Sequence, residues 1–258
     1  MGTETVNSRY QVITTPPAIQ GDPTEGLFTP TSAQKYRLGT KLFDNHGRVW
    51  RYSKNAGTQL EVALMAQCEA QDAQSIEQIQ TAGAIIAVGK TKFNLIVATG
   101  SGITDGELSD GWLVVNKSTG LGYSYPIKWN EWITSDTTIN IELYEPIRVA
   151  TATTTEFTFI INRWSNVLVM PTTVTGIAAG VPNVVIPASY YGWLQTKGYC
   201  PMTVDAGDTL VIGAAVGNPG TNGTAGGAGI PAITTQIWGH TVYIATAGET
   251  ALIDLNLE

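Results

Sequence analysis

The sequence predicts a mainly β protein with an antiparallel sandwich or barrel architecture. Side chains alternate between two faces in short runs, most clearly at residues 191–196 and 251–256, and a period of two is typical of strands. The 28 glycines fall largely between such runs, where turns need residues that tolerate unusual backbone angles. Only 14% of the residues are charged, which is unfavourable for long surface helices. We therefore expect at most one or two short helices.

The first 35 residues predict an extended N-terminal arm. Prolines at positions 16, 17, 23 and 30 favour extended backbone and remove hydrogen-bond donors. Isolated apolar residues interrupt this polar stretch, and an arm laid on a partner surface would use them, whereas a free tail would not. A disordered terminus remains an equal alternative. The apolar residues of the arm are Tyr10, Val12, Ile13, Ile19, Leu27 and Phe28.

Residues 36–53 predict a hairpin, because Asp44, Asn45 and Gly47 favour a tight turn between two apolar runs. Residues 57–70 have good helix propensity and form the one plausible helix, which could continue to Gln80. A strand at the start of this segment is the alternative.

Further strands recur about every ten residues, separated by Gly, Asn, Asp and Pro, which favours a sandwich or barrel over a βαβ fold. We predict a β-rich domain over residues 36–175. Glycine and proline cluster at residues 171–187, so we place a boundary there, and residues 176–258 are predicted to form a small C-terminal β-barrel. The strands predicted in the first domain span residues 82–88, 92–98, 111–116, 122–128, 138–144, 156–162 and 166–170.

Motifs of enzyme chemistry are not found. The two histidines, His46 and His240, lack the partners of a hydrolytic triad, and no Cys or His cluster has the spacing of metal ligands. Five residues separate Gly83 from Gly89, whereas a phosphate-binding loop needs four. Residues 105–111 could hold a hard cation or be a plain turn. We expect no enzyme activity, no cofactor and no metal.

The charge balance also limits the possible partners. The net charge is −7, and no basic stripe suited to nucleic acid is found. The longest apolar runs are far shorter than a membrane helix requires, and no signal peptide opens the sequence, so we expect a protein made in a cytoplasm. The two cysteines, Cys68 and Cys200, are more consistent with buried thiols than with a disulfide framework. The densest basic group could be a solvated hairpin face or a patch that meets an acidic partner. Its members are Arg37, Lys41, Arg48, Arg51 and Lys54.

Seven tryptophans are present, and core packing explains most of them. Trp129 and Trp132 flank a polar dipeptide and are the best candidates for exposed aromatic residues, suited to sugar stacking or to subunit contact. The glycine-rich residues 217–229 predict a hairpin tip or a loop that orders against a neighbouring subunit.

Five runs share a recognisable pattern, namely residues 38–52, 110–116, 143–149, 190–195 and 251–257. In this pattern the chain resembles virion proteins of tailed bacteriophages, of the capsid decoration or cement type. The likeness covers most of residues 36–257, and no catalytic motif defines the family, so no functional residue is carried over. The resemblance implies a β-rich, homotrimeric protein that binds the major capsid protein on the outer surface of the virion, after assembly in the host cytoplasm.

Two functional hypotheses follow. In the first, the chain is a structural decoration protein that stabilises a capsid, and the arm residues, with Trp129 and Trp132, contact the partner. In the second, it is a carbohydrate-binding or host-adsorption module of a phage fibre or tail, with Trp129, Trp132 and residues 217–229 as the contact surface.

Overall fold

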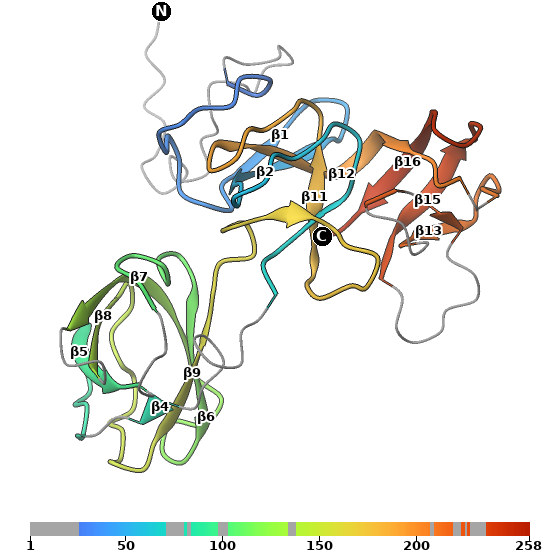
Figure 1. Ribbon diagram of the computed structural model, residues 1–258. Helices are drawn as coiled ribbons and strands as arrows, with labels where there is room; N and C mark the ends of the chain where they lie inside the picture. Colours follow the sequence, from blue (N-terminus) through green and yellow to red (C-terminus); the bar gives the residue numbers. More distant parts are fainter. Residues whose placement is uncertain are drawn as a thin grey trace, which may run out of the picture. The chain divides into compact units, whose positions relative to one another are not determined.

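The regular elements of the protein are strands, and the mainly β fold class is confirmed (Figure 1). A computed structural model describes residues 26–70, 80–81, 84–97, 103–133, 138–206, 209–218, 223–224, 226–227 and 236–258. Within these ranges the strands pair antiparallel. The same ranges contain no helix, and so none with the length and apolar character needed to cross a membrane.

The chain divides into two compact units. Met1–Glu69 and Arg163–Glu258 together form one unit, here the sheet unit, and Ala70–Asn162 form the other, here the barrel unit. The barrel unit is thus an insertion in the sheet unit. The structure divides the chain elsewhere than at the expected boundary between residues 175 and 176. Residues 171–187 contain a strand that pairs on both sides within the sheet unit, so their glycines and prolines mark bends inside one unit.

The barrel unit is a closed barrel with the strand order β4-β5-β8-β7-β6-β9. The closed barrel therefore lies in the inserted segment, whereas the sequence placed a barrel at residues 176–258. Predicted and observed strands overlap at most positions. The strands are β4 (Gln80–Thr81), β5 (Lys92–Ile96), β6 (Trp112–Lys117), β7 (Ser124–Ile133), β8 (Thr138–Leu143) and β9 (Glu156–Ile160).

Strict alternation fills the barrel. On β8, Ile139, Ile141 and Leu143 point inward, and on β9 Phe157 and Phe159 do the same. Each such side chain contributes roughly 1.5–3 kcal/mol when fully buried. Outward positions carry ion pairs between neighbouring strands, such as Lys117 with Glu156 and Lys128 with Glu142. The apolar face of the sheet therefore forms the interior of the barrel.

The sheet unit is an open sheet with the order β10-β3-β11-β12-β16-β15-β13-β14, and β1 and β2 join it through β12 (Figure 1). The long strand β12 pairs with β2, β11 and β16, so it is central to the unit. The strands are β1 (Lys41–Phe43), β2 (Val49–Lys54), β3 (Ala66–Gln67), β10 (Leu168–Val169), β11 (Ala178–Pro182), β12 (Tyr191–Thr203), β13 (Ala215–Gly217), β14 (Gly226–Gly227), β15 (Ile237–Tyr243) and β16 (Thr250–Asn256).

The environment of β12 changes along its length. Its first half is buried on both faces, with Trp193 in one apolar cluster and Leu194 in another. A bulge follows at Gln195, whose buried amide donates hydrogen bonds to the carbonyls of Lys197 and Tyr199. Beyond the bulge, residues alternate between core and solvent, because the second half of β12 covers the core on only one face.

The predicted hairpin is present, and the helix predicted at residues 57–70 is wrong, while its possible continuation over residues 71–79 lies outside the described ranges. Lys41–Phe43 pairs with Val49–Lys54, and Gly47 adopts the left-handed conformation that its turn requires, with φ of 82°. Within residues 57–70 the backbone is extended or turned. Leu60 exchanges backbone hydrogen bonds with Ile186, and the Met65 N–H bonds to the Gly223 carbonyl. These long-range pairings outweigh the local helix propensity.

The predicted strand at residues 82–88 is also wrong for residues 84–88, which form no strand. Ile86 is buried, and its N–H bonds to the Thr151 hydroxyl, whereas Ile85 and Val88 are exposed. These apolar residues therefore place one buried side chain, Ile86, between two exposed ones without strand pairing.

Both cysteines are free thiols. Cys200 lies in the core of the sheet unit, and its burial raises the pKa of the thiol to about 12. Cys68 accepts a hydrogen bond from the Ile177 N–H.

Candidate binding surfaces

The outer face of strands β12, β16 and β15 carries two rows of cross-strand neighbours. In the first row, Asp254 lies between Tyr199 and His240, and in the second, Leu252 lies between Pro201 and Tyr243. We call these six residues the tyrosine face. A bulge between Thr241 and Tyr243 brings His240 and Tyr243 to the same side of the sheet.

The tyrosine face is aromatic and weakly charged. Tyr199 is 57% exposed and Tyr243 is 60% exposed. Exposed Val211 and Ile212 lie close by, since Gly213 and Ala214 bond to the backbone of Thr241. Tyrosine is enriched in protein interfaces because it offers a large contact area with one polar end. This surface is therefore suited to contact with another protein.

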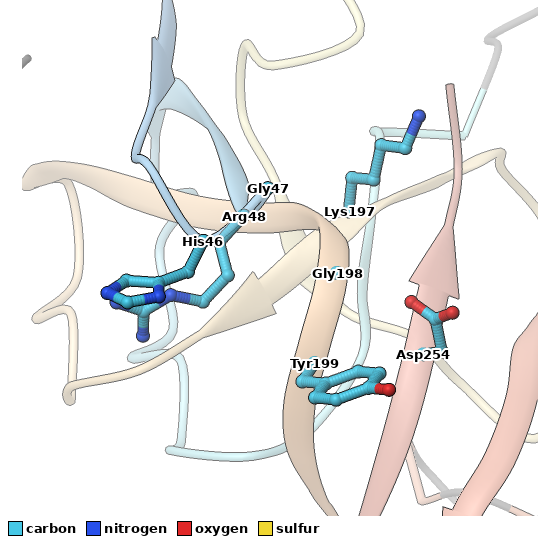
Figure 2. A pocket seen from close by; sticks show the side chains of 7 residues that line it. All are labelled: His46, Gly47, Arg48, Lys197, Gly198, Tyr199 and Asp254. Carbon is cyan, nitrogen blue, oxygen red and sulfur yellow. The ribbon is translucent and has the colours of Figure 1, made fainter.

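A depression of about 420 Å³ adjoins the tyrosine face, where the turn of the β1–β2 hairpin meets β12. Figure 2 shows Tyr199 and Asp254 on neighbouring strands, with Lys197 extending from the same strand as Tyr199. Gly198 has φ of 80°, and a Cβ atom there would lie 3.1 Å from the Cα atom of Arg48. The close approach of the hairpin to β12 thus depends on this glycine. The depression is lined by His46, Gly47, Arg48, Lys197, Gly198, Tyr199 and Asp254.

The basic group predicted around the hairpin is largely paired within the chain. The Glu258 carboxylate contacts Arg51 at 2.6 Å and Lys41 at 3.2 Å, and Asp44 contacts Arg48 at 2.7 Å. Burial would raise the pKa of the Glu258 carboxyl. Hydrogen bonds from Arg51 and Thr196, with the positive charge of Arg51, outweigh this effect and lower the pKa to about 2. These ion pairs leave the hairpin less basic than its sequence suggests.

Replacing Glu258 with glutamine is expected to lower the free energy of unfolding by about 1–2 kcal/mol at pH 7, less than full linkage would give because the pair is partly solvated. The pKa of the Glu258 carboxyl is lower in the folded protein than its ordinary value of 4.5, so the carboxylate stabilises the fold fully at pH values above 4.5. This stabilisation is lost as the pH falls through about 2. Denaturant unfolding at several pH values would test this. The difference from the original protein should shrink towards pH 2. A difference in unfolding free energy that stays constant with pH would contradict the prediction. The control is Glu145→Gln, because Glu145 forms an exposed ion pair with Arg148, and it should change stability by less than about 0.5 kcal/mol.

A second candidate surface lies on the outside of the barrel unit. Strands β5, β8 and β7 align two rows there, Lys92–Glu142–Trp129 and Asn94–Asn140–Glu131. Together these six residues line a depression of about 300 Å³. We call them the Trp129 face.

A bulge and a tight loop position Trp129. The register between β7 and β8 shifts between Ile127 and Trp129, so Lys128 and Trp129 both face outward between buried Ile127 and buried Asn130. The Trp129 ring lies against Gly106, where a Cβ atom would come within 2.6 Å of it. Buried Asn130 holds that loop by accepting a bond from the Leu108 N–H and donating one to the Thr104 carbonyl, both 2.8 Å long. Trp129 nevertheless remains 49% exposed.

The residues predicted to contact a partner belong to both units, and the structure describes some of them. Leu27 is buried in its own unit, and Phe28 beside it is 46% exposed. Trp129 is exposed, as predicted. The backbone of Trp132 pairs with Ile139, and the Trp132 side chain lies outside the described part of the structure. Four predicted residues also lie outside the described ranges, namely Tyr10, Val12, Ile13 and Ile19.

Sequence reasoning missed the two tyrosines of the tyrosine face and the polar neighbours of Trp129. Tyr199 alternates with buried Cys200, so its outward position could have been inferred from the pattern. Asn94, Asn140 and Glu131 come from three strands, and only the strand register places them side by side.

Reactive groups do not converge among the residues that the structure describes. His46 lies in the hairpin turn, and its N–H bonds to Asp44, while His240 is exposed on β15. No group of three or more His, Cys, Asp or Glu side chains in the described ranges could hold a metal ion. Residues 105–110 form a turn next to Trp129, as expected from their composition.

Comparison with protein-family models, with curated proteins and with solved structures finds no match for this chain.

Proposed function

We propose that this chain is a structural virion protein of a tailed bacteriophage that attaches to the outer surface of the capsid and stabilises the shell. The tyrosine face carries this proposal, because a regular, exposed and weakly charged aromatic surface is suited to binding another protein. The resemblance of residues 38–52 and 190–195 to decoration proteins supports the same function. In this function the chain is not an enzyme and needs no cofactor.

The proposed partner is the major capsid protein, contacted by a homotrimer. A shallow face binds weakly alone, but contacts repeated by the symmetry of a trimer and a shell raise the overall affinity without deeper contacts. The acidic balance of the chain fits a role on the outside of the shell, away from the packaged nucleic acid.

The N-terminal arm would supply a second attachment. Its described end joins the sheet unit, since Thr31 and Tyr191 exchange two backbone hydrogen bonds of 3.0 and 2.8 Å. Leu27 is buried beside this bridge. The preceding residues thus start from an anchored point, and in this proposal they add to a sheet edge of the capsid protein by main-chain hydrogen bonds.

Replacing both Tyr199 and Tyr243 with serine is expected to weaken binding to undecorated shells at least about tenfold, because interface tyrosines commonly contribute 1 kcal/mol or more each. Co-sedimentation of the purified protein with shells of the phage that encodes it would measure the affinity. Both side chains are exposed, so the fold should be retained, and circular dichroism would check this.

Tyr123→Ser is the matched control, since Tyr123 is an exposed tyrosine of the barrel unit. It should bind shells as the original protein does. Full affinity in the Tyr199 and Tyr243 double variant, or an equal loss in the control, would remove the tyrosine face as the attachment surface.

A further inference from the structure

The Trp129 face combines an aromatic ring with polar side chains in one shallow depression. Trp129 stands at the end of one row, and amide and carboxylate groups of Asn94, Asn140 and Glu131 form the next row. Sugars present the same two chemistries, since one face of a pyranose ring exposes C–H groups and its edge carries hydroxyls. Aromatic rings bind such C–H faces, and polar groups around them fix the orientation.

The ring of Trp129 is fixed in place before any ligand binds. The bulge on β7 turns the side chain outward, and the loop held by Asn130 supports it at Gly106. A ring held on a strand in this way loses little conformational freedom on binding, which favours affinity at a small site. A tryptophan that served only to fill the barrel core would be buried, whereas Trp129 is half exposed.

The polar row offers groups able to bind hydroxyls. The Asn140 amide donates to the Glu131 carboxylate at 3.1 Å, which leaves the Asn140 carbonyl and the second Glu131 oxygen as acceptors. Asn94 is exposed, and its side chain makes no hydrogen bond among the described residues. Its amide can therefore both donate to and accept from a ligand.

The charges around the depression balance. Glu142 contacts Lys128 at 2.6 Å and Lys92 at 3.0 Å, and Glu131 carries a second negative charge. Hydrogen bonds from Lys128 and Lys92 hold the pKa of the Glu142 carboxyl below its usual value, so the ion pairs persist at neutral pH. The two residue rows and Lys128 together carry two positive and two negative charges, so they offer no excess positive charge to a phosphate-bearing ligand. A neutral ligand is therefore favoured.

We propose that the Trp129 face binds a neutral sugar residue of a glycan, with the Trp129 ring beneath the sugar and Asn94, Asn140 and Glu131 on its hydroxyls. The depression of about 300 Å³ is open and small, so a single site binds weakly, with a dissociation constant on the order of 1 mM. This function goes beyond attachment to a capsid. It would let the barrel unit hold a surface glycan while the sheet unit holds the shell.

An array of immobilised neutral and acidic glycans, probed with the labelled full chain, would test the proposal. Signal is expected on neutral glycans, and titration of the best-bound sugar as its methyl glycoside should quench tryptophan fluorescence. Trp129→Ala should weaken binding at least tenfold, and Asn94→Ala several-fold. Trp112→Ala is the matched control, because Trp112 is 47% exposed on β6 of the same barrel and does not line the depression. It should bind as the original protein does.

No signal on the array, together with no quenching of tryptophan fluorescence by methyl glycosides at concentrations well above about 1 mM, would overturn the proposal. Binding that survives Trp129→Ala, or that falls equally with Trp112→Ala, would also overturn it. Binding to shells is measured separately with variants of the sheet unit, so failure of the glycan site leaves the proposed capsid function untouched.

Discussion

Replacing Phe157 with alanine is expected to destabilise the barrel unit by about 3–5 kcal/mol. Phe157 is fully buried in a core made only of barrel-unit residues. Its strand, β9, pairs with both β4 and β6, and so joins the first strand of the barrel to the rest. The substitution removes most of an aromatic side chain where the neighbouring strands are held on both sides, so the cavity cannot readily collapse.

Peptide-resolved hydrogen exchange would measure this effect. Peptides from β6 and β8 should lose protection, and peptides from β12 and β16 should keep it, because the cores of the two units share no residue. Phe157→Leu retains much of the volume and should cost less than about 1.5 kcal/mol. Equal loss of protection in both units would contradict the division of the chain into separately packed cores.

Replacing Trp50 with alanine is expected to destabilise the sheet unit by about 3–5 kcal/mol. Trp50 is buried with Leu42, Tyr52 and Trp193. Its indole N–H donates to the Asn183 side-chain oxygen at 2.8 Å, and the Arg48 guanidinium lies 5.0 Å from the ring centre. The alanine variant therefore loses packing, a partly buried hydrogen bond and a cation–π contact together.

The same exchange experiment should give the opposite pattern for Trp50→Ala, with protection lost in β2 and β12 and kept in β6 and β8. Trp50→Phe keeps an aromatic ring but leaves Asn183 without its donor, so an intermediate loss of about 1–2 kcal/mol is expected. A loss below 1 kcal/mol for the alanine variant would show that the packing around Trp50 contributes little.

The hairpin at residues 41–54 and most strands could be predicted from the sequence, because turn chemistry and a period of two are local signals. No signal within residues 57–70 contradicts the helix expected there. Its backbone partners, Ile186 and Gly223, lie more than a hundred residues away in sequence. The insertion of the barrel unit was also hidden, because strands of both units show the same alternation of buried and exposed side chains.

The candidate surfaces were only partly predictable. Trp129 was identified as exposed from its polar neighbours in sequence, but its orientation depends on a bulge and on Gly106, neither of which has a clear sequence signal. The tyrosine face depends on the pairing of β12 with β16 and of β16 with β15. The paired residues Tyr199 and Asp254 lie more than 50 positions apart in the sequence. Surfaces built from cross-strand rows become visible only when the register is known.

Electron microscopy of virions that carry this chain, at a resolution that resolves strands, tests the proposed function most directly. We expect density for the sheet unit on the outer surface of the shell, repeated with the shell symmetry, with Tyr199 and Tyr243 against the major capsid protein. Density confined to the tail or its fibres, or contact with the shell through a different face, would contradict it.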